Sequence, residues 1–393
     1  MHEHDTDISV VGAGPAGAWA ARQLAAGGMR VALFDASHPR EKACGGGITG
    51  RALDEIAAAV PAETLDGVAV EDASFHAGLG DEASVDLRPR GASRRRLLVV
   101  DRRSFDAALL EAAIRAGAEH IRERVTDVLV GSDGVRLQTN RRSYRCSRVI
   151  GADGVNSLVR RRTAGPLARA DLSIATGYFV FGETSRDVRV EFVSAPPGYF
   201  WSFPRRDHLA VGACAQADAA RVGPLAALVT ERIRDAVRPG RQLVRYSWPI
   251  PSLGPASLAR EQPAGDRWFL AGDAAGLVDP ITREGIFFAI RSASLAAEAI
   301  LGVADAPARY ASALRREIYP ELSRAARLKR GFFSGPFTRL LVEALRQSQP
   351  VREVMADLVA GEQPYKTLKR RLLATLEVRL AWRLLLLEMG VAR

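Results

Sequence analysis

The first forty residues alternate between short apolar runs and segments rich in glycine or alanine. Ile8–Val11 and Val31–Phe34 are rich in β-branched and aromatic residues, which is typical of buried parallel strands. Between them, glycines at positions 12, 14 and 17 open an alanine-rich segment to about Ala26 that we expect to be helical. Strand, tight turn, helix and strand follow one another, so the pattern predicts a parallel βαβ unit.

Similar apolar runs return up to about residue 165. Leu97–Val100 reads as a strand, and the segment from Asp101 to about Ala116 reads as a helix ended by Gly117. Further strands are expected at His120–Val125, Val128–Val130, Val135–Thr139 and Tyr144–Val149, with a hairpin turn at Gly131–Gly134 and a basic helix at Leu158–Arg162.

The middle of the chain has a different pattern, in which short apolar runs are spaced by turn residues. This spacing is typical of an antiparallel sheet. The expected strands are Thr176–Phe181, Val188–Val193, Tyr199–Phe203, Leu209–Cys214 and Leu243–Trp248, with a helix at Leu225–Ala236.

After this sheet, Trp268–Ala271 is again a buried strand, a long helix is expected at Phe287–Leu301, and the remainder reads as helical. We therefore predict an α/β protein with a Rossmann-like domain, an inserted antiparallel-sheet domain and a helical C-terminal region. The predicted boundaries are 1–60, 97–165 and 265–305 for the first, 61–96 and 166–264 for the second, and 306–393 for the third.

Composition narrows the function classes. The chain has 393 residues with 47% hydrophobic and 25% charged residues, which is ordinary for a globular protein. Its formal net charge is +10, but it contains no recognised nucleic-acid module, so we expect no nucleic-acid partner. Attraction to anionic lipid or to a phosphorylated substrate is the preferred interpretation of the charge.

Neither a membrane span nor a metal site is expected. No apolar run approaches the roughly 20 residues that cross a bilayer, and the polar N-terminus does not resemble a secretory signal. The cysteines Cys44, Cys146 and Cys214 and the six histidines show no metal-ligand spacing. A cytoplasmic location, with or without membrane association, is the simplest expectation.

The glycine-rich turn is a candidate dinucleotide site. Gly12 permits the tight turn, Gly14 lets the backbone approach a pyrophosphate, and Gly17 allows close packing of helix on strand. The helix N-terminus favours phosphate, and Asp35 ends the second strand near the spacing at which a carboxylate meets a ribose hydroxyl.

A second glycine-rich segment, Cys44–Gly50, holds three consecutive glycines. Ordering them is costly, so we expect unusual backbone angles or close approach to a ligand. A flexible linker is the alternative. Two further glycine-bearing turns lie at Gly151–Ser157 and Gly272–Gly276.

In this order, the four turns resemble those of FAD-dependent oxidoreductases of the p-hydroxybenzoate hydroxylase type. The resemblance implies that the first turn holds the ADP half of FAD, that Arg102 contacts the cofactor, and that Asp273 lies on the ribitol side. It implies cofactor contacts from Gly12, Gly14, Pro15, Ala16, Gly17, Asp35, Ala36, Cys44, Gly45, Gly46, Gly47, Arg102, Val125, Asp153, Gly272, Asp273, Gly285 and Ile286.

Within that group, the chain is most similar to the geranylgeranyl reductases over roughly residues 7–300. Three segments carry the similarity: Cys44–Ile48, the Tyr-Phe-Trp-Ser-Phe-Pro sequence at Tyr199–Pro204, and Gly272–Ile286. Arg283 departs from the third motif, where small residues are common, and we expect it to alter the flavin edge of the pocket.

The resemblance implies reduction of isolated carbon–carbon double bonds in a polyprenyl chain, with flavin supplying hydride and the protein a proton. Cys44 is the candidate acid, and a small packing residue is the alternative; Glu284 is a weaker candidate acid. Tyr199, Trp201 and Phe203 share one face of a strand and form either the wall of a hydrophobic substrate pocket or ordinary core.

Other functions stay open at this point. A flavin monooxygenase or halogenase acting on an aromatic or natural-product substrate is one alternative, although the Trp-x-Trp-x-Ile-Pro motif of tryptophan-type halogenases is absent. A lipid-binding flavoprotein without turnover is another. With one dinucleotide fold visible, we expect NADPH, NADH or ferredoxin to donate electrons without a dedicated domain.

The last segment, from Tyr365 to Leu387, is basic and amphipathic. Its apolar face is predicted to hold Leu373, Leu376, Leu380, Leu384 and Leu387, with Lys369 and Arg383 near the edges and Trp382 at headgroup depth. Such a helix either lies in a membrane interface or docks on its own protein.

Overall fold

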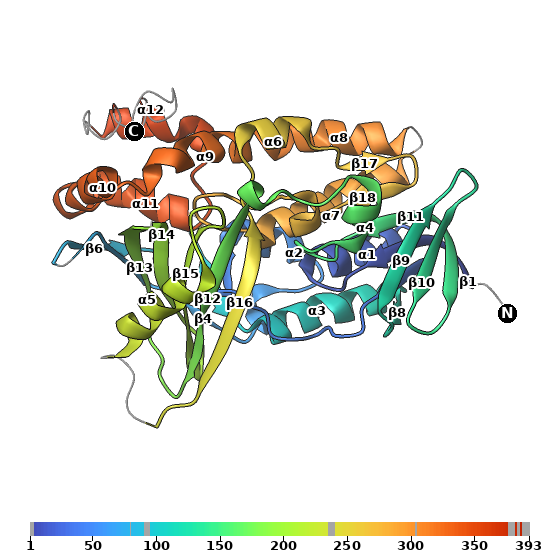
Figure 1. Ribbon diagram of the computed structural model, residues 1–393, viewed down its shortest axis with the longest axis horizontal. Helices are drawn as coiled ribbons and strands as arrows, with labels where there is room; N and C mark the ends of the chain where they lie inside the picture. Colours follow the sequence, from blue (N-terminus) through green and yellow to red (C-terminus); the bar gives the residue numbers. More distant parts are fainter. Residues whose placement is uncertain are drawn as a thin grey trace.

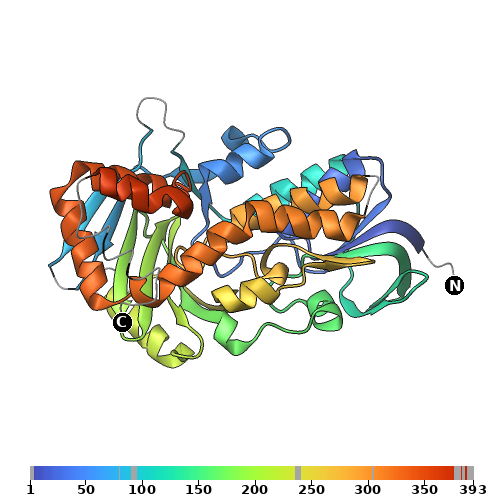
Figure 2. The same ribbon diagram turned by 90° about the horizontal axis from the view of Figure 1, so that it is seen from above.

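The computed structural model describes residues 4–78, 80–89, 95–234, 240–302 and 305–375, together with Trp382 and Leu386. Two large sheets lie in different halves of the molecule, and helices from the last third of the chain run across both halves (Figures 1 and 2).

The first sheet is built around the parallel strands β1 and β11. Its order is β17-β18-β11-β1-β2-β8, with the antiparallel pair β9 and β10 attached to β11. The strands are β1 His4–Val11, β2 Val31–Phe34, β8 Glu119–Ile121, β9 Val125–Val130, β10 Val135–Thr139, β11 Ser143–Gly151, β17 Ala264–Gly265 and β18 Trp268–Leu270. The parallel strands β1, β2, β8, β11 and β18 bring the carboxyl ends of segments distant in sequence to one edge.

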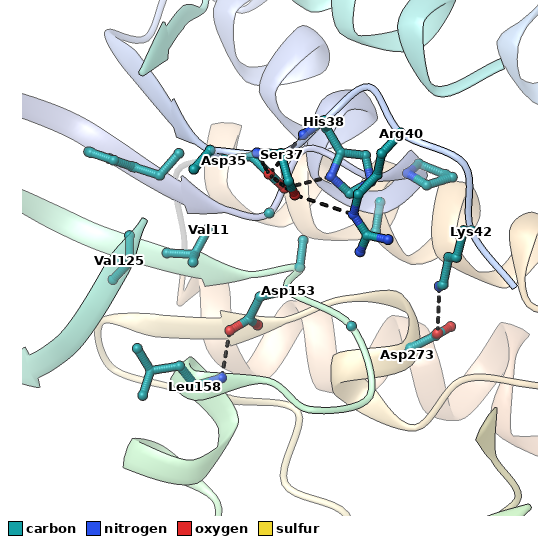
Figure 3. A pocket seen from close by; sticks show the side chains of 18 of the residues that line it. Val11, Asp35, Ser37, His38, Arg40, Lys42, Val125, Asp153, Leu158 and Asp273 are labelled. Carbon is teal, nitrogen blue, oxygen red and sulfur yellow. Dashed lines mark hydrogen bonds and ion pairs between the residues drawn. The ribbon is translucent and has the colours of Figure 1, made fainter. Parts of the chain in front are cut away.

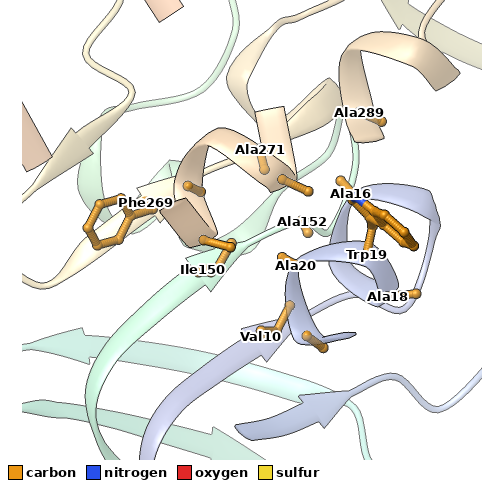
Figure 4. Close-up of a cluster of buried hydrophobic side chains, with 14 of the residues drawn as sticks. Val10, Ala16, Ala18, Trp19, Ala20, Ile150, Ala152, Phe269, Ala271 and Ala289 are labelled. Carbon is orange, nitrogen blue, oxygen red and sulfur yellow. The ribbon is translucent and has the colours of Figure 1, made fainter. Parts of the chain in front are cut away.

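Helices cover this sheet because their small and apolar faces are buried against it. The helices of this half are α1 Pro15–Ala26, α3 Arg102–Arg115, α4 Leu158–Thr163 and α7 Ile286–Leu301. Trp19 of α1 is buried and its Nε1 donates to Ser294 Oγ of α7 at 2.9 Å. Figure 4 shows Trp19 close to Ala16 and Ala152, where alanines permit close approach of α1 to the sheet.

The second sheet has the order β16-β12-β15-β14-β13-β5-β6 and is antiparallel except between β13 and β5. Its strands are β5 Asp72–His76, β6 Glu82–Asp86, β12 Leu172–Phe181, β13 Asp187–Ser194, β14 Pro197–Pro204, β15 His208–Gln216 and β16 Leu243–Pro251. The helix α5 Val222–Arg234 packs on β12 and β15. The period-two pattern of β14 puts Tyr199, Trp201 and Phe203 on one face.

A small third sheet has the strand order β3-β7-β4. It consists of β3 Gly47–Thr49, β4 Gly67–Ala69 and β7 Leu97–Val100, and α2 Gly50–Ile56 follows β3 directly. Short helical segments complete this part: η1 Ala62–Thr64, η2 Arg169–Asp171, η3 Gly272–Ala275 and α6 Pro255–Arg260.

The C-terminal helices are α8 Ala306–Glu317, α9 Tyr319–Phe332, α10 Gly335–Gln347, α11 Gln349–Val359 and α12 Tyr365–Ala374. The helix α8 packs on α7, whereas α10 and α11 pack on β6 of the second sheet (Figure 2). Phe333, Phe337, Met355 and Leu368 join the buried cluster of that half, so these helices form part of its core.

Most predicted elements match the structure within a few residues. The strand expected at His120–Val125 is wrong: β8 ends at Ile121, and β9 begins at Val125. The expected helix at Leu225–Ala236 begins earlier, at Val222, and its last described residue is Arg234. In the predicted amphipathic C-terminal segment, Leu376, Leu380, Arg383, Leu384 and Leu387 lie outside the described residues.

Candidate active site

The glycine turn between β1 and α1 is built for close backbone approach. Gly12 has φ +98°, and a Cβ there would lie 2.5 Å from the carbonyl oxygen of Ala152. A Cβ on Gly17 would lie 1.8 Å from the Gly12 oxygen, so Gly17 allows α1 to pack against its own turn. At Gly14 the nearest atom is His38 Nε2 at 3.7 Å, which leaves the backbone open to a ligand.

A first cavity opens at this turn, at the carboxyl edge of the first sheet (Figure 3). Among the residues that line it are Val11, Gly12, Gly14, Pro15, Ala16, Asp35, Ala36, His38, Lys42, Arg102, Val125, Asp153, Trp248 and Asp273. Gly17 and Gly272, both expected to contact a cofactor, do not line it. They lie where helices pack: a Cβ on Gly272 would meet Ala16 and Ala289 at 3.1 Å.

Asp35 lines this cavity, but its carboxylate is occupied by the protein. It accepts hydrogen bonds from the backbone N–H of Ala13 at 3.0 Å and Ser37 at 2.7 Å, and His38 Nδ1 lies 2.7 Å from its Oδ2. Burial alone would raise the pKa of Asp35, yet the contacts with His38 and the backbone N–H groups outweigh it and lower that pKa strongly. A ribose contact from Asp35 stays a prediction.

His38 connects Asp35 to a second, fully buried ion pair. Its Nε2 lies 3.3 Å from Asp106 Oδ2, and Arg102 donates to both oxygens of Asp106 at 3.0 and 2.9 Å. Burial alone would lower the pKa of His38, but Asp106 and Asp35 raise it. A protonated His38 therefore lies between two carboxylates, and Asp35, His38, Asp106 and Arg102 form a neutral chain of charges.

The opposite side of the first cavity carries two more carboxylates. Lys42 Nζ lies 3.2 Å from Asp273 Oδ2. Asp153 Oδ2 accepts the Leu158 N–H at 2.6 Å at the start of α4, whereas its Oδ1 is buried without a hydrogen-bond partner. Burial raises the pKa of Asp153. An unpartnered buried oxygen beside an open cavity is suited to a ligand hydroxyl or N–H group.

A second cavity continues from the first and is largely apolar. Both are lined by Pro15, Lys42, Arg102, Trp248, Asp273 and Ala289, so they form one elongated cleft. The second cavity lies between the Cys44–Gly47 loop, the β14 face and the C-terminal helices. Its lining includes Cys44, Gly45, Gly46, Gly47, Phe75, Tyr199, Trp201, Phe203, Arg283, Glu284, Gly285, Ile286, Phe332, Phe333, Met355 and Val359.

Three of the four aromatic residues of β14, Tyr199, Trp201 and Phe203, line this second cavity. Tyr199 stacks on Phe333 with ring centroids 6.0 Å apart, and its hydroxyl donates to the Thr282 oxygen at 3.0 Å. A Cβ on either Gly45 or Gly47 would lie 3.1 Å from the ring of Phe203. The aromatic face is therefore packed directly against the glycine loop, and its substrate-binding role stays a prediction.

The Cys44–Gly46 loop is held by Arg205, a residue that the sequence pattern did not single out. Arg205 is 1% exposed and donates to the carbonyl oxygens of Cys44 at 3.1 Å and Gly45 at 3.2 Å. Its guanidinium also pairs with Asp101 at 2.7 Å. Gly46 has φ +86°, and a Cβ there would lie 2.3 Å from the Val100 oxygen. The loop is thus an ordered structure and not a flexible linker.

Cys44 Sγ lies at the wall of the second cavity and accepts the Gly46 N–H at 3.3 Å. Burial alone would lower the pKa of Arg102, but Asp106 and Cys44 outweigh it and raise that pKa, which places Arg102 close to the thiol. Glu284 accepts from Thr49 Oγ1 at 2.7 Å and pairs with Arg51. Its carboxylate therefore connects its own loop to the end of β3 and the start of α2. The Thr49 hydroxyl and the Arg51 guanidinium thus both hold the Glu284 carboxylate, and its role as an acid stays a prediction.

Comparison with known proteins places this cleft in a family. A family model described as an FAD binding domain matches residues 5–310. The chain belongs to this FAD binding family. It is an FAD-dependent oxidoreductase of the geranylgeranyl reductase-like type.

Several relatives of this flavoprotein are named as reductases. A menaquinone reductase of Mycobacterium tuberculosis is 30% identical over 75% of this chain and 76% of its own. A digeranylgeranylglycerophospholipid reductase of Methanothrix thermoacetophila is 29% identical over 75% and 77%. In fold, the chain is similar to a geranylgeranyl bacteriochlorophyll reductase-like protein from Thermoplasma acidophilum, with a TM-score of 0.77, 23% identity, and coverage of 95% of this chain and 100% of that one.

The residues present fit FAD. The Gly12–Gly17 turn and the α1 N-terminus suit the diphosphate, and Asp153 Oδ1 is free to accept from a cofactor hydroxyl. The elongated cleft would let the cofactor extend from Asp35 towards Gly285 and Ile286, where α7 begins. In the part of the chain that the structure describes, no cluster of side chains could hold a metal ion, and no helix is long and apolar enough to cross a membrane.

Sequence reasoning missed several site residues: His38, Lys42, Arg205 and the aromatic pair Phe332 and Phe333. The signals were weak: His38 and Lys42 lie in a polar loop, and Phe332 and Phe333 lie in the last part of the chain, which reads only as helical. Arg205 directly follows the Tyr199–Pro204 motif, and its position after a buried strand could have marked it.

Proposed function

We propose that this flavoprotein reduces isolated carbon–carbon double bonds of a polyprenyl chain. The observation that carries the proposal is the second cavity, where an apolar aromatic wall faces the Cys44–Gly47 loop at the end of the cofactor cleft. A polar substrate would gain little from the apolar wall to which Trp201, Phe203 and Phe333 contribute, whereas an isoprenoid chain would bury its surface against that wall. The names of the relatives point to the same substrate class.

When bound and reduced, FAD supplies a hydride to one alkene carbon. The protein must place the double bond and deliver a proton to the other carbon. Cys44 is the proposed donor, because its Sγ lines the cavity and is fixed by the Gly46 N–H. After transfer the thiolate would be stabilised by Arg102 and would recover a proton from solvent.

The wall residues Tyr199, Trp201 and Phe203 are proposed to hold the chain and to exclude water. The roles of the cofactor residues named from the sequence are likewise part of this proposal. NADPH, NADH or ferredoxin is proposed as electron donor, and measuring flavin reduction by each under anaerobic conditions identifies it.

The test uses the FAD-loaded protein without oxygen. The flavin is reduced chemically, and geranylgeranyl diphosphate, a digeranylgeranyl phospholipid or menaquinone is added. The expected result is flavin reoxidation with the gain of two hydrogen atoms per double bond. A monooxygenase or halogenase is the second candidate. It is favoured if the flavin is reoxidised only by oxygen and an aromatic product gains oxygen or halogen, and a carrier without turnover gives no product at all.

Contact with a membrane surface is a further part of this proposal. Leu373 of α12 is 46% exposed beside Lys369 and Arg370, and Trp382, which follows this helix in the sequence, is 59% exposed. These residues would bring the second cavity, which α9 and α11 help to line, near a lipid substrate. Sedimentation with anionic vesicles tests it: Leu373→Ser with Trp382→Ser should reduce binding, and equal binding by the variant would contradict it.

A further inference from the structure

The backbone of Arg283 adopts a conformation that side chains avoid. Arg283 has φ +61° and is the one non-glycine residue with positive φ among those that the structure describes. It follows the Asx turn in which Asp279 Oδ1 accepts the Ile281 N–H at 2.7 Å. Glycine would satisfy this backbone without strain, so an arginine here indicates that its side chain is used.

The Arg283 guanidinium lines the second cavity without a carboxylate partner. Its Nη1 donates to Ser252 Oγ at 2.5 Å, and its Nε is buried with no hydrogen-bond partner. Within the described residues it forms no ion pair. Both carboxylates of its own loop are engaged elsewhere. Glu284 pairs with Arg51 and accepts from Thr49 Oγ1, and Asp279 accepts two backbone N–H groups.

A second cation lies directly behind it. Lys329 of α9 donates to Ser252 Oγ at 3.1 Å, to the Ser252 carbonyl oxygen at 3.0 Å and to Gln216 Oε1 at 3.1 Å. It also forms no ion pair within the described residues. Burial first, and then repulsion by Arg283, lowers the pKa of Lys329 to about 8, so it is largely charged at neutral pH.

Arg283 at the cavity wall and Lys329 behind it share one hydroxyl, and the carboxylates that act on Lys329, Asp171 and Asp218, form no ion pair with it within the described residues. Two neighbouring cations of this kind are unfavourable unless an anion completes the site. Charges in such surroundings are normally neutralised by a partner. Arginine offers a planar fork of donors that matches the geometry of phosphate, and of the Arg283 donors only Nη1 has a hydrogen bond to the protein among the described residues.

We propose that Arg283, supported by Lys329, forms a subsite for the phosphate or diphosphate group of an isoprenoid substrate whose chain lies in the second cavity. The inference rests on the proposed function and narrows it. It favours prenyl diphosphates and prenyl phospholipids over a neutral substrate such as a prenylated quinone, because only the former neutralise the two cations.

The test compares binding of geranylgeranyl diphosphate, geranylgeraniol and inorganic pyrophosphate to the oxidised, FAD-loaded protein by titration calorimetry. Using oxidised flavin keeps charge on the reduced cofactor out of the measurement. The wild type should bind the diphosphate at least tenfold more tightly than the alcohol, and pyrophosphate alone should bind weakly. Equal affinity for diphosphate and alcohol, or equal affinity for pyrophosphate and the prenyl diphosphate, would overturn the subsite.

Two variants of Arg283 separate the effect of its charge from the effect of its backbone conformation. Arg283→Gly relieves the positive φ and should fold, and it should abolish the tenfold preference while leaving geranylgeraniol affinity unchanged. In Arg283→Met a residue with a side chain must still adopt the positive φ, but its charge is gone, so this variant should lose the same preference. Arg206→Ser, which removes an exposed arginine paired with Asp66 outside the cavity, is the control for net charge. A preference retained in both Arg283 variants contradicts the proposal.

Failure of the phosphate subsite can be told apart from failure of the proposed reductase function. If geranylgeraniol is reduced but the diphosphate binds no more tightly, the subsite fails and the reductase stands. If the diphosphate is preferred through Arg283 but no prenyl substrate is reduced, the subsite stands and the reductase fails.

Discussion

The two cavities lie end to end, but their charges are arranged in opposite ways. In the first, Asp35, His38, Asp106 and Arg102 neutralise one another, and Lys42 pairs with Asp273. At the second, Arg283 of the wall shares Ser252 with Lys329, which lies behind it, and neither cation forms an ion pair within the described residues. The difference suggests that the first cavity is fixed before its ligand arrives, whereas the second still needs an anion from its ligand.

The largest expected effect is at the glycine turn of the first cavity. Gly17→Ala puts a Cβ within 1.8 Å of the Gly12 oxygen and should destabilise the fold by about 3 kcal/mol or more, with loss of bound flavin. Flavin content per protein and thermal unfolding measure it. Gly28→Ala is the control: Gly28 has φ +86° but open space around it, so it should cost only about 1 kcal/mol and retain flavin.

The next effect is at the Cys44 loop, where the two cavities meet. Arg205→Met leaves Asp101 and two loop carbonyl groups without their donor and should cost about 3 kcal/mol. Denaturant unfolding of the FAD-loaded protein measures this change. The neighbouring Arg206→Met removes an arginine that is 64% exposed and should change stability by less than about 1 kcal/mol. Similar losses in both variants would argue against a loop-holding role for Arg205.

These two sites show what the sequence can predict. The glycine turn is local: strand, glycines and helix lie within about twenty residues, so spacing alone predicts its geometry. Arg205, by contrast, reaches Cys44 across 161 positions, and no local pattern encodes that contact. Tyr199, Trp201 and Phe203 were predictable as one face by period two, but Phe333 and Met355 join them through helix packing that periodicity does not specify.

The third effect concerns pH and the second cavity. The pKa of Lys329 falls from an ordinary 10.5 to about 8, so the unfolded chain binds more protons than the folded one between these values. Stability should therefore rise with pH across this window, by on the order of 3 kcal/mol from this group. The groups that act on Lys329 are Arg283, Asp171 and Asp218.

Urea unfolding of the wild type and Lys329→Met at pH 8 and at about pH 10.5 isolates this contribution, because other titrating groups are common to both proteins. The wild type should gain stability relative to the variant as pH rises. If the free energy of unfolding changes with pH in the same way in both proteins, the pKa of Lys329 is not lowered in the folded state.

The smallest effect is at Tyr199. Tyr199→Phe removes the hydrogen bond to Thr282 but keeps the ring on Phe333, so it should cost about 1 kcal/mol and leave prenyl binding unchanged. Trp201→Ala, which opens the same wall, should weaken binding of the chain clearly more. Equal effects on binding would indicate that the wall does not contact substrate.

The most direct measurement of the central claim is a single anaerobic turnover followed by the absorbance of oxidised flavin. Protein with reduced FAD is mixed with geranylgeranyl diphosphate in the absence of oxygen. We expect saturable reoxidation, one flavin per double bond reduced, and slower reoxidation in Cys44→Ala than in Cys44→Ser. Flavin that stays reduced with every prenyl substrate, and is reoxidised only when oxygen is admitted, would contradict it.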